Sequence, residues 1–243
     1  MPTVLLLRHG LTAMTGPVLA GRTPAVHLDE RGTAQAAAVA DRLAVLPLAA
    51  VVTSPLERCA ETARAVTRAQ KAAGRTVPLR SDRRLLECDY GDWTGRSIES
   101  LAKDPLWPVV QSHPSGVRFP GGESMAAMAE RAVRAVRDID ASLAEKSGPE
   151  ALWVACSHGD VIKAILADAL GLHLDLFQRL VVDPCSVSAI RYTAGRPFVL
   201  STNDTTGELS RFLPPPPAKG SAARGRATSS DATVGGGAGA GAV

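Results

Sequence analysis

Cysteine is scarce in this sequence, and its few residues follow no metal-binding pattern. The 243 residues include four cysteines, Cys59, Cys88, Cys156 and Cys185, and no two of them form a Cys-x-x-Cys pair. Their spacings match no zinc site, so we expect no metal. The short apolar start of the chain ends at Arg8 without a preceding basic segment, which is not the pattern of a secretory signal. The sequence therefore favours reduced thiols in a cytoplasmic protein.

Long apolar runs and an excess of one charge are also missing. No uninterrupted apolar stretch approaches the ~20 residues that a membrane-spanning helix needs, which excludes an integral membrane protein. The formal net charge is only +3, and three basic residues against one acidic residue in segment 214–243 account for +2 of it. Residues 1–213 therefore carry about +1. We expect neither a membrane nor a nucleic acid as partner.

Composition divides the chain into two parts. Hydrophobic residues make up 45% of the sequence, an ordinary fraction for a globular protein. Residues 214–243 instead begin with four consecutive prolines and continue in Ala, Gly, Ser and Thr without a hydrophobic period. Such a segment buries too little apolar surface to offset the entropy of ordering. We expect one folded domain over 1–213 and a disordered Pro/Gly/Ala-rich tail over 214–243.

Short apolar runs alternate with helical patterns through the first part. The apolar runs are typical of strands that helices cover on both faces, and they lie at 3–7, 50–53 and 151–156. The helical patterns lie over 30–45, 56–72, 125–146 and 160–170. Two late strands are expected at 187–192 and 197–201. This alternation predicts an α/β fold, a three-layer α/β/α sandwich around a mainly parallel sheet.

Basic side chains follow all three apolar runs. The tripeptides RHG at 8–10 and SHG at 157–159 each place a histidine directly after a predicted strand, and Arg58 lies just inside the helix after 50–53. Each feature alone is more often an ordinary surface or core group. Parallel strands, however, end at one edge of the sheet, where helix N-termini favour anions. Two arginines and two histidines at that edge predict a site for a dianion such as phosphate.

In this order and spacing, the motifs resemble those of the histidine phosphatase superfamily, also called phosphoglycerate mutase-like. The matching segments are LLLRHGLT at 5–12, GRTPAVHLDERGTAQA at 21–36, SPLERCAETA at 54–63, LLECDYGDWTG at 85–95, FPGGES at 119–124 and CSHGDVIKAIL at 156–166. The resemblance covers about residues 3–202. It implies the phosphoglycerate mutase-like fold and makes 1–213 a catalytic domain.

The resemblance also gives each catalytic candidate a role. His9 would be the nucleophile that becomes phosphohistidine, and Glu87 would donate a proton to the leaving group. Arg8, Arg58 and His158 would bind and neutralise the phosphoryl oxygens. These roles suit the residue types, because a neutral imidazole is a competent nucleophile near pH 7 and an alkoxide leaves slowly unless it is protonated. The scheme requires no metal and no cofactor.

Five further residues are expected to bind the substrate. Many members of the family carry an asparagine a few residues after RHG; here Thr15 matches that position, and its hydroxyl can donate one hydrogen bond. Gly21, Arg22 and Thr23 are expected to line the pocket, as is Gly159. For Arg22 an ordinary loop charge is an equally good interpretation.

Residues 96–120 hold four prolines and no regular period, so we expect an irregular insertion packed over the domain surface. Four aromatic side chains lie in it or near it, and they either form a wall that selects the leaving group or pack the insertion onto the domain. Packing is preferred for at least two of them. These side chains are Tyr90, Trp93, Trp107 and Phe119.

The same segment helps to choose among three functions. Cofactor-dependent mutases of the family carry a longer insertion with paired arginines, which 96–120 lacks, and the pattern LxExxxGxWxG at 85–95 is closer to the phosphatase branch. We expect a histidine acid phosphatase-type enzyme, a phosphoric monoester hydrolase acting on a small phosphorylated metabolite. A phosphoglycerate mutase-type phosphomutase is the alternative, and a non-catalytic phospho-ligand sensor is a second one.

Overall fold

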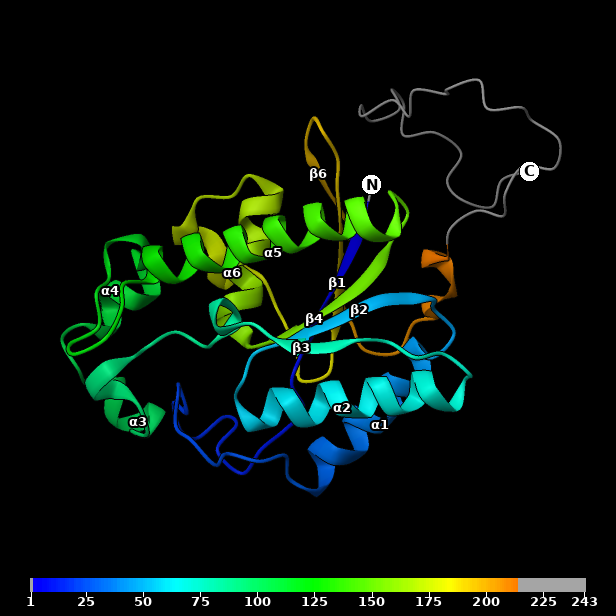
Figure 1. The fold of residues 1–243 in the computed structure, drawn as a ribbon. Coiled ribbons are helices and arrows are strands. Elements are labelled where there is room, and N and C mark those ends of the chain that lie inside the picture. The colour runs from blue at the N-terminus through cyan, green and yellow to red at the C-terminus, as the bar shows by residue number, and fades with distance from the viewer. Residues whose placement is uncertain (1, 214–243) are drawn as a thin grey trace, which may run out of the picture.

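A computed structural model describes residues 2–213 of the chain, and Figure 1 shows how their helices and strands are arranged. The strands are β1 (Thr3–Arg8), β2 (Leu48–Thr53), β3 (Leu79–Ser81), β4 (Leu152–Ser157), β5 (Val187–Tyr192) and β6 (Pro197–Asp204). The helices are α1 (Glu30–Leu43), α2 (Glu57–Ala72), α3 (Ile98–Leu101), α4 (Trp107–Ser112), α5 (Met125–Ser147) and α6 (Gly159–Leu170). The predicted tail over 214–243 lies outside the described residues, so its disorder stays a prediction.

The described strands form one sheet in the order β3-β2-β4-β1-β5-β6. The four strands from β3 to β1 are parallel to one another. Strand β5 is antiparallel to β1, and β6 is antiparallel to β5. Strands β1 and β4 are paired in register from Thr3 and Leu152 to Arg8 and Ser157. The residues that follow these two strands therefore meet at the same edge. The prediction of a mainly parallel sheet is confirmed.

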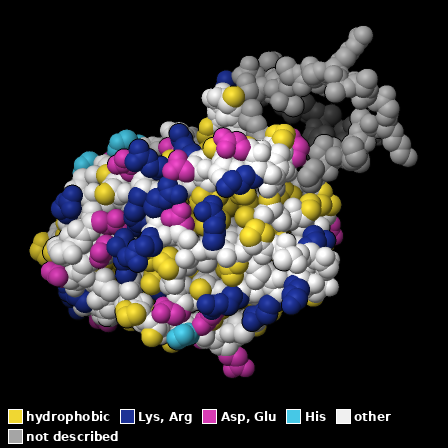
Figure 2. Space-filling view, viewed as in Figure 1, with side chains coloured by type: hydrophobic (Ala, Val, Ile, Leu, Met, Phe, Trp, Pro, Cys, Tyr) yellow, Lys and Arg dark blue, Asp and Glu magenta, His cyan; other side chains and the backbone are white. Residues whose placement is uncertain are grey.

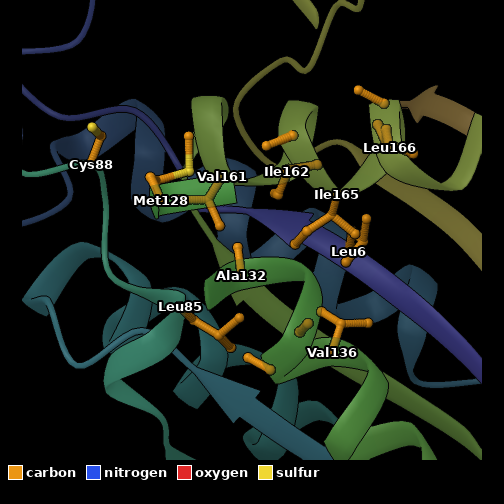
Figure 3. Close-up of a cluster of buried hydrophobic side chains, with 14 of the residues drawn as sticks. Leu6, Leu85, Cys88, Met128, Ala132, Val136, Val161, Ile162, Ile165 and Leu166 are labelled. Carbon is orange, nitrogen blue, oxygen red and sulfur yellow. The ribbon is translucent and has the colours of Figure 1, made fainter. Parts of the chain in front are cut away.

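Helices cover both faces of the sheet, because neighbouring residues of each strand point to opposite sides. Leu5 and Leu7 pack in the cluster that contains the buried faces of α1 and α2, whereas Val4 and Leu6 pack in the cluster that contains α5 and α6. Figure 1 shows the two helix pairs on opposite sides of the strands. In Figure 3, Leu6 of β1 meets side chains from α5 and α6. The three-layer sandwich is thus confirmed.

Capping residues fix where three of the helices begin or end. The Asp29 carboxylate accepts a hydrogen bond from the Gly32 amide at 2.7 Å and starts α1. Ser124 accepts one from the Ala127 amide at 3.1 Å and starts α5. Helix α6 ends at Gly171, whose φ of 67° is the left-handed conformation that glycine adopts without strain.

The structure differs from the sequence prediction in two places. Strand β3 was not predicted, because it is only three residues long and all three are exposed. The segment 96–120 is not irregular throughout: it contains α3 and α4, and Pro108 lies in the first turn of α4, where proline is tolerated. Its packing over the surface is confirmed, since Leu101 is completely buried.

The surface bears charges of both signs. Figure 2 shows basic side chains next to acidic ones, in keeping with ion pairs such as Arg84 with Asp138 at 2.6 Å and Arg137 with Asp168 at 2.7 Å. Within residues 2–213, none of the helices combines the length and the apolar composition that crossing a bilayer requires.

Candidate active site

The strand ends converge on a cavity of about 170 Å³ at the carboxyl edge of the sheet. Arg8 and His9 come from the end of β1, Arg58 from the first turn of α2, and Glu87 from the loop after β3. Close backbone packing sets the RHG turn in place: a Cβ on Gly32 would lie 1.9 Å from the Leu11 carbonyl oxygen, so only glycine fits there. The topology thus brings together residues that are up to 79 positions apart in the sequence.

His9 is held in one tautomer. Its Nδ1 lies 2.7 Å from the Gly10 carbonyl oxygen, which can only accept, so Nδ1 carries the proton. In the neutral ring, Nε2 then holds a lone pair, and the Arg58 Nε donates to it at 3.3 Å. Burial and the neighbouring Arg58 charge lower the pKa of His9 from 6.5 to about 3. The ring is therefore neutral at physiological pH and presents a nucleophilic nitrogen.

Two guanidinium groups carry the positive charge of the site. Arg58 is 2% exposed, and its Nη2 donates to the Gly21 carbonyl at 2.7 Å; the Arg8 Nη1 donates to the Val182 carbonyl at 2.7 Å. The Arg8 Nε and the Arg58 Nη1 are buried and have no hydrogen-bond partner among residues 2–213. Since a buried charged donor is costly when unpartnered, both groups are suited to an anion in the cavity.

His158 lies behind Arg58 rather than on the cavity wall. The ring centroids of His158 and His9 are 5.3 Å apart, so the two histidines meet as the sequence predicted. The Arg58 Nη2 lies 3.3 Å from the His158 Nδ1, and because arginine can only donate, this Nδ1 is the acceptor. The proton of the neutral His158 ring is therefore on Nε2, which donates to the Ser54 Oγ at 2.8 Å. Burial and Arg58 lower the pKa of His158 well below its ordinary value. Direct contact with a phosphoryl group stays a prediction.

Glu87 is a buried carboxyl group on the cavity wall. It is 9% exposed, and its Oε1 accepts a hydrogen bond from the Cys88 amide at 2.9 Å. Burial, and then the negative charge of Asp160, raise the pKa of Glu87 from 4.5 to about 7. The carboxyl group is therefore partly protonated at neutral pH, as a general acid must be.

The remaining predicted binding residues fall into two groups. Thr15, Gly21 and Gly159 line the cavity, and the Thr15 hydroxyl accepts a hydrogen bond from the Thr12 amide at 3.0 Å. Arg22 and Thr23 do not line it.

Arg22 instead holds the acidic loop together. Its guanidinium donates to the Glu87 carbonyl at 2.9 Å and to the carboxylates of Asp89 at 3.1 Å and Glu123 at 2.9 Å. These contacts make Arg22 a structural clamp behind Glu87, and its contact with substrate stays a prediction.

Sequence reasoning missed Asp160 and Ser54. Asp160 lines the cavity and accepts a hydrogen bond from the Tyr90 hydroxyl at 2.7 Å, across 70 positions of sequence. Ser54 holds His158 as described above. Its position directly after β2 matched the pattern that identified the histidines, so that signal was available. Asp160 gave no such signal, because its role depends on Tyr90.

At least two of the four aromatic side chains pack the insertion onto the domain, as the sequence favoured. Trp93 and Phe119 are each 2% exposed and pack edge to face at 5.4 Å between ring centroids, with Trp107 stacked on Trp93 at 6.1 Å. Tyr90 is the member of the set that lines the cavity. Over the described part of the chain, no cluster of three or more His, Cys, Asp or Glu side chains could hold a metal ion.

Comparison with known proteins places this geometry in a family. A family model described as the histidine phosphatase superfamily (branch 1) matches residues 4–205. A probable phosphoglycerate mutase (GpmB) of Erwinia tasmaniensis is 32% identical over 218 residues, which cover 87% of this chain and 95% of that protein.

Two solved structures show the same fold. The mycobacterial glucosyl-3-phosphoglycerate phosphatase superimposes with a TM-score of 0.73 at 26% identity, covering 83% of this chain and 98% of its own. Bacillus stearothermophilus YhfR superimposes with a TM-score of 0.74 at 28% identity, covering 84% and 98%. Similarity thus extends to proteins named as mutases and as phosphatases.

Proposed function

Because the chain belongs to the histidine phosphatase superfamily (branch 1), we propose that it is a phosphomonoesterase that acts on a small phosphorylated metabolite through a phosphohistidine on His9. The proposal rests on two buried N–H groups, one of Arg8 and one of Arg58, that lie in the same site as the lone pair of His9 Nε2. Neither N–H group has a hydrogen-bond partner among residues 2–213. Fixed cationic donors next to a nucleophile suit phosphoryl transfer. Relatives named as phosphatases and mutases support an enzyme.

In the first step, the lone pair of His9 Nε2 attacks phosphorus, and the bond between phosphorus and the leaving oxygen breaks. Arg8 and Arg58 bind the phosphoryl oxygens and stabilise the charge that spreads over them. Glu87 in its protonated form gives its proton to the leaving oxygen, so an alcohol departs rather than an alkoxide. The products of this step are the alcohol and the phosphohistidine.

In the second step, a water molecule hydrolyses the phosphohistidine. The Glu87 carboxylate accepts a proton from this water as its oxygen attacks phosphorus, and the bond between phosphorus and Nε2 breaks. Inorganic phosphate leaves, the imidazole is neutral again, and Glu87 is protonated for the next cycle. His158 fixes the Arg58 guanidinium throughout. No step uses a metal or a cofactor.

The test is phosphate release from p-nitrophenyl phosphate in the presence of EDTA. We expect turnover by the wild type and its loss in His9→Ala, while His173→Ala, which removes a histidine with a 67% exposed side chain, keeps wild-type activity. Acid-labile labelling of the wild type by a ³²P-labelled ester identifies the phosphohistidine. Equal activity in wild type and His9→Ala, or complete loss in EDTA, contradicts the proposal.

A phosphomutase is the second candidate, because a relative that is 32% identical is named a probable phosphoglycerate mutase. A mutase predicts exchange between 2- and 3-phosphoglycerate that is faster than phosphate release, whereas release alone excludes it. Stable phosphate binding without turnover on any ester favours the third candidate, a phospho-ligand sensor.

A further inference from the structure

Two arginines carry the positive charge of the cavity wall among the described residues. Among the cavity-lining residues within 2–213, the lysine and arginine residues are Arg8 and Arg58, and both charges act on His9. Arg22 directly follows the lining residue Gly21 in the sequence, but its guanidinium makes three hydrogen bonds with the acidic loop and Glu123. Once a phosphoryl group is bound to Arg8 and Arg58, the described lining offers no further Lys or Arg to a second anionic group.

Two other lining residues present hydrogen-bond acceptors to the cavity. Asp160, in the first turn of α6, and Tyr90 both line it. The Tyr90 hydroxyl has one hydrogen, which it donates to the Asp160 carboxylate at 2.7 Å. The remaining capacity of both groups, the lone pairs of the phenol and of the carboxylate, can only accept. A substrate that meets this pair has to bring donors of its own.

The leaving group is the part of the substrate that meets Asp160. Glu87 must reach the ester oxygen to protonate it, and Asp160 is close enough to Glu87 to act on its charge. The first atoms beyond the ester oxygen therefore lie within reach of Asp160. A carboxylate there meets the Asp160 carboxylate, while Arg8 and Arg58 are engaged by the phosphoryl group.

The segment after the RHG turn gives the cavity an apolar side. The cavity lining includes the apolar residues Met14, Val18, Leu19 and Ala20. These groups cannot stabilise a charge, but they can contact the carbon skeleton of a leaving group. The cavity wall thus combines apolar residues with hydrogen-bond acceptors.

We propose that Asp160, fixed by Tyr90, selects the leaving group: the enzyme acts on monoesters of uncharged or cationic alcohols that carry a hydroxyl or ammonium donor, and it rejects monoesters with a carboxylate within two carbon atoms of the ester carbon. This inference rests on the proposed phosphatase function. It goes further because it excludes phosphoglycerates and phosphoserine as good substrates.

Two matched pairs of esters test the selection. In the first pair, glycerol 3-phosphate has a hydroxymethyl group where 3-phosphoglycerate has a carboxylate. In the second pair, phosphoethanolamine lacks the carboxylate of phosphoserine. We expect wild-type kcat/KM to be at least about tenfold higher for the first member of each pair. Asp160→Asn should reduce each ratio by about tenfold, whereas Asp160→Glu should keep it. Where an ester turns over too slowly, its inhibition constant against p-nitrophenyl phosphate gives the same comparison.

Controls separate selection from folding. Glu145→Gln removes a carboxylate from an exposed position on α5 and should leave both ratios unchanged. Asp160→Asn removes a negative charge beside Glu87 and should lower the pKa of Glu87, so the basic limb of the pH profile of kcat/KM should move to lower pH. If Asp160 had only a structural role, its replacement would not move this limb. Equal or reversed wild-type preference, or ratios that Asp160→Asn leaves unchanged, overturns the inference while the phosphatase proposal stands. Absence of turnover on every ester, the aryl ester included, refutes the phosphatase proposal and this inference together.

Discussion

Replacing Glu87 with glutamine should make the protein more stable and less active, and the gain in stability should depend on pH. Burial keeps the Glu87 carboxyl group neutral, with a pKa of about 7 against an ordinary 4.5. Between these two values the folded protein keeps a proton that the unfolded chain releases, so stability falls as pH rises through this window. Below about pH 4.5 both states hold the proton, and Glu87 contributes no such cost.

The size of the effect follows from the two pKa values. A difference of about 2.5 in pKa corresponds to about 3 kcal/mol at 1.36 kcal/mol for each pH unit, reached in full above about pH 7. Glutamine does not ionise, so Glu87→Gln avoids this cost. Any constant penalty for its buried amide is the same at every pH. The change in the stability difference with pH therefore isolates the ionisation of Glu87.

Urea unfolding followed by circular dichroism at several pH values measures this change. Between about pH 5 and pH 8.5, the stability of Glu87→Gln relative to the wild type should rise by about 2.5 kcal/mol. Glu145→Gln, an exposed carboxylate, should show no such rise. A stability difference that stays constant within about 0.5 kcal/mol over this range refutes the reasoning, because Glu87 would then have its ordinary pKa in the folded protein.

The same variant should lose general acid catalysis. Turnover of alkyl monoesters should fall by about 10² to 10⁴-fold, the usual contribution of a positioned acid. Turnover of p-nitrophenyl phosphate should fall much less, because that leaving group departs without protonation. Stopped phosphate-release assays on both ester types give the ratio.

Three further substitutions test other contacts of the site. Arg58→Lys keeps the charge, but an ammonium group cannot reproduce the three contacts that the planar guanidinium makes with His9, Gly21 and His158. The value of kcat/KM for p-nitrophenyl phosphate should therefore fall about 100-fold, which corresponds to about 2.7 kcal/mol, while the circular dichroism spectrum stays unchanged. Arg22→Met should lower kcat more than it raises KM in steady-state assays, because Arg22 clamps the Glu87 loop without lining the cavity; a rise in KM alone would contradict this. Gly32→Ala should lower the free energy of unfolding, measured by urea denaturation, by about 2 kcal/mol or more, because its Cβ meets a backbone oxygen. Thr33→Ala on the exposed side of α1 should not lower it.

The buried strands could be predicted from the sequence because they are continuous apolar runs bounded by polar turns. Strand β4 is buried at all six positions, and its apolar run left no alternative to a central strand. The short elements could not be predicted in this way. Strand β3 has three exposed residues, and α3 has four residues, which is too few for a helical period to be visible.

The site was predictable where a residue's place in the chain determines its place in the fold. His9 and His158 directly follow paired strands, so the register of β1 with β4 brings them together. Arg22 and Asp160 lie beyond this reasoning. The positions of their side chains depend on contacts 65 to 101 residues away, with the acidic loop for Arg22 and with Tyr90 for Asp160. Local sequence does not encode such contacts.

The charges of the site explain why an acidic residue stands beside the general acid. The two arginines that we propose as phosphate ligands help to keep His9 neutral, but the same positive charges lower the pKa of Glu87 and favour its ionised form. A site with two guanidinium groups therefore tends to ionise its own acid. Burial and the negative charge of Asp160 oppose that tendency, and together they outweigh the arginines. Asp160 thus connects two properties: the carboxylate that keeps Glu87 protonated also repels an anionic leaving group.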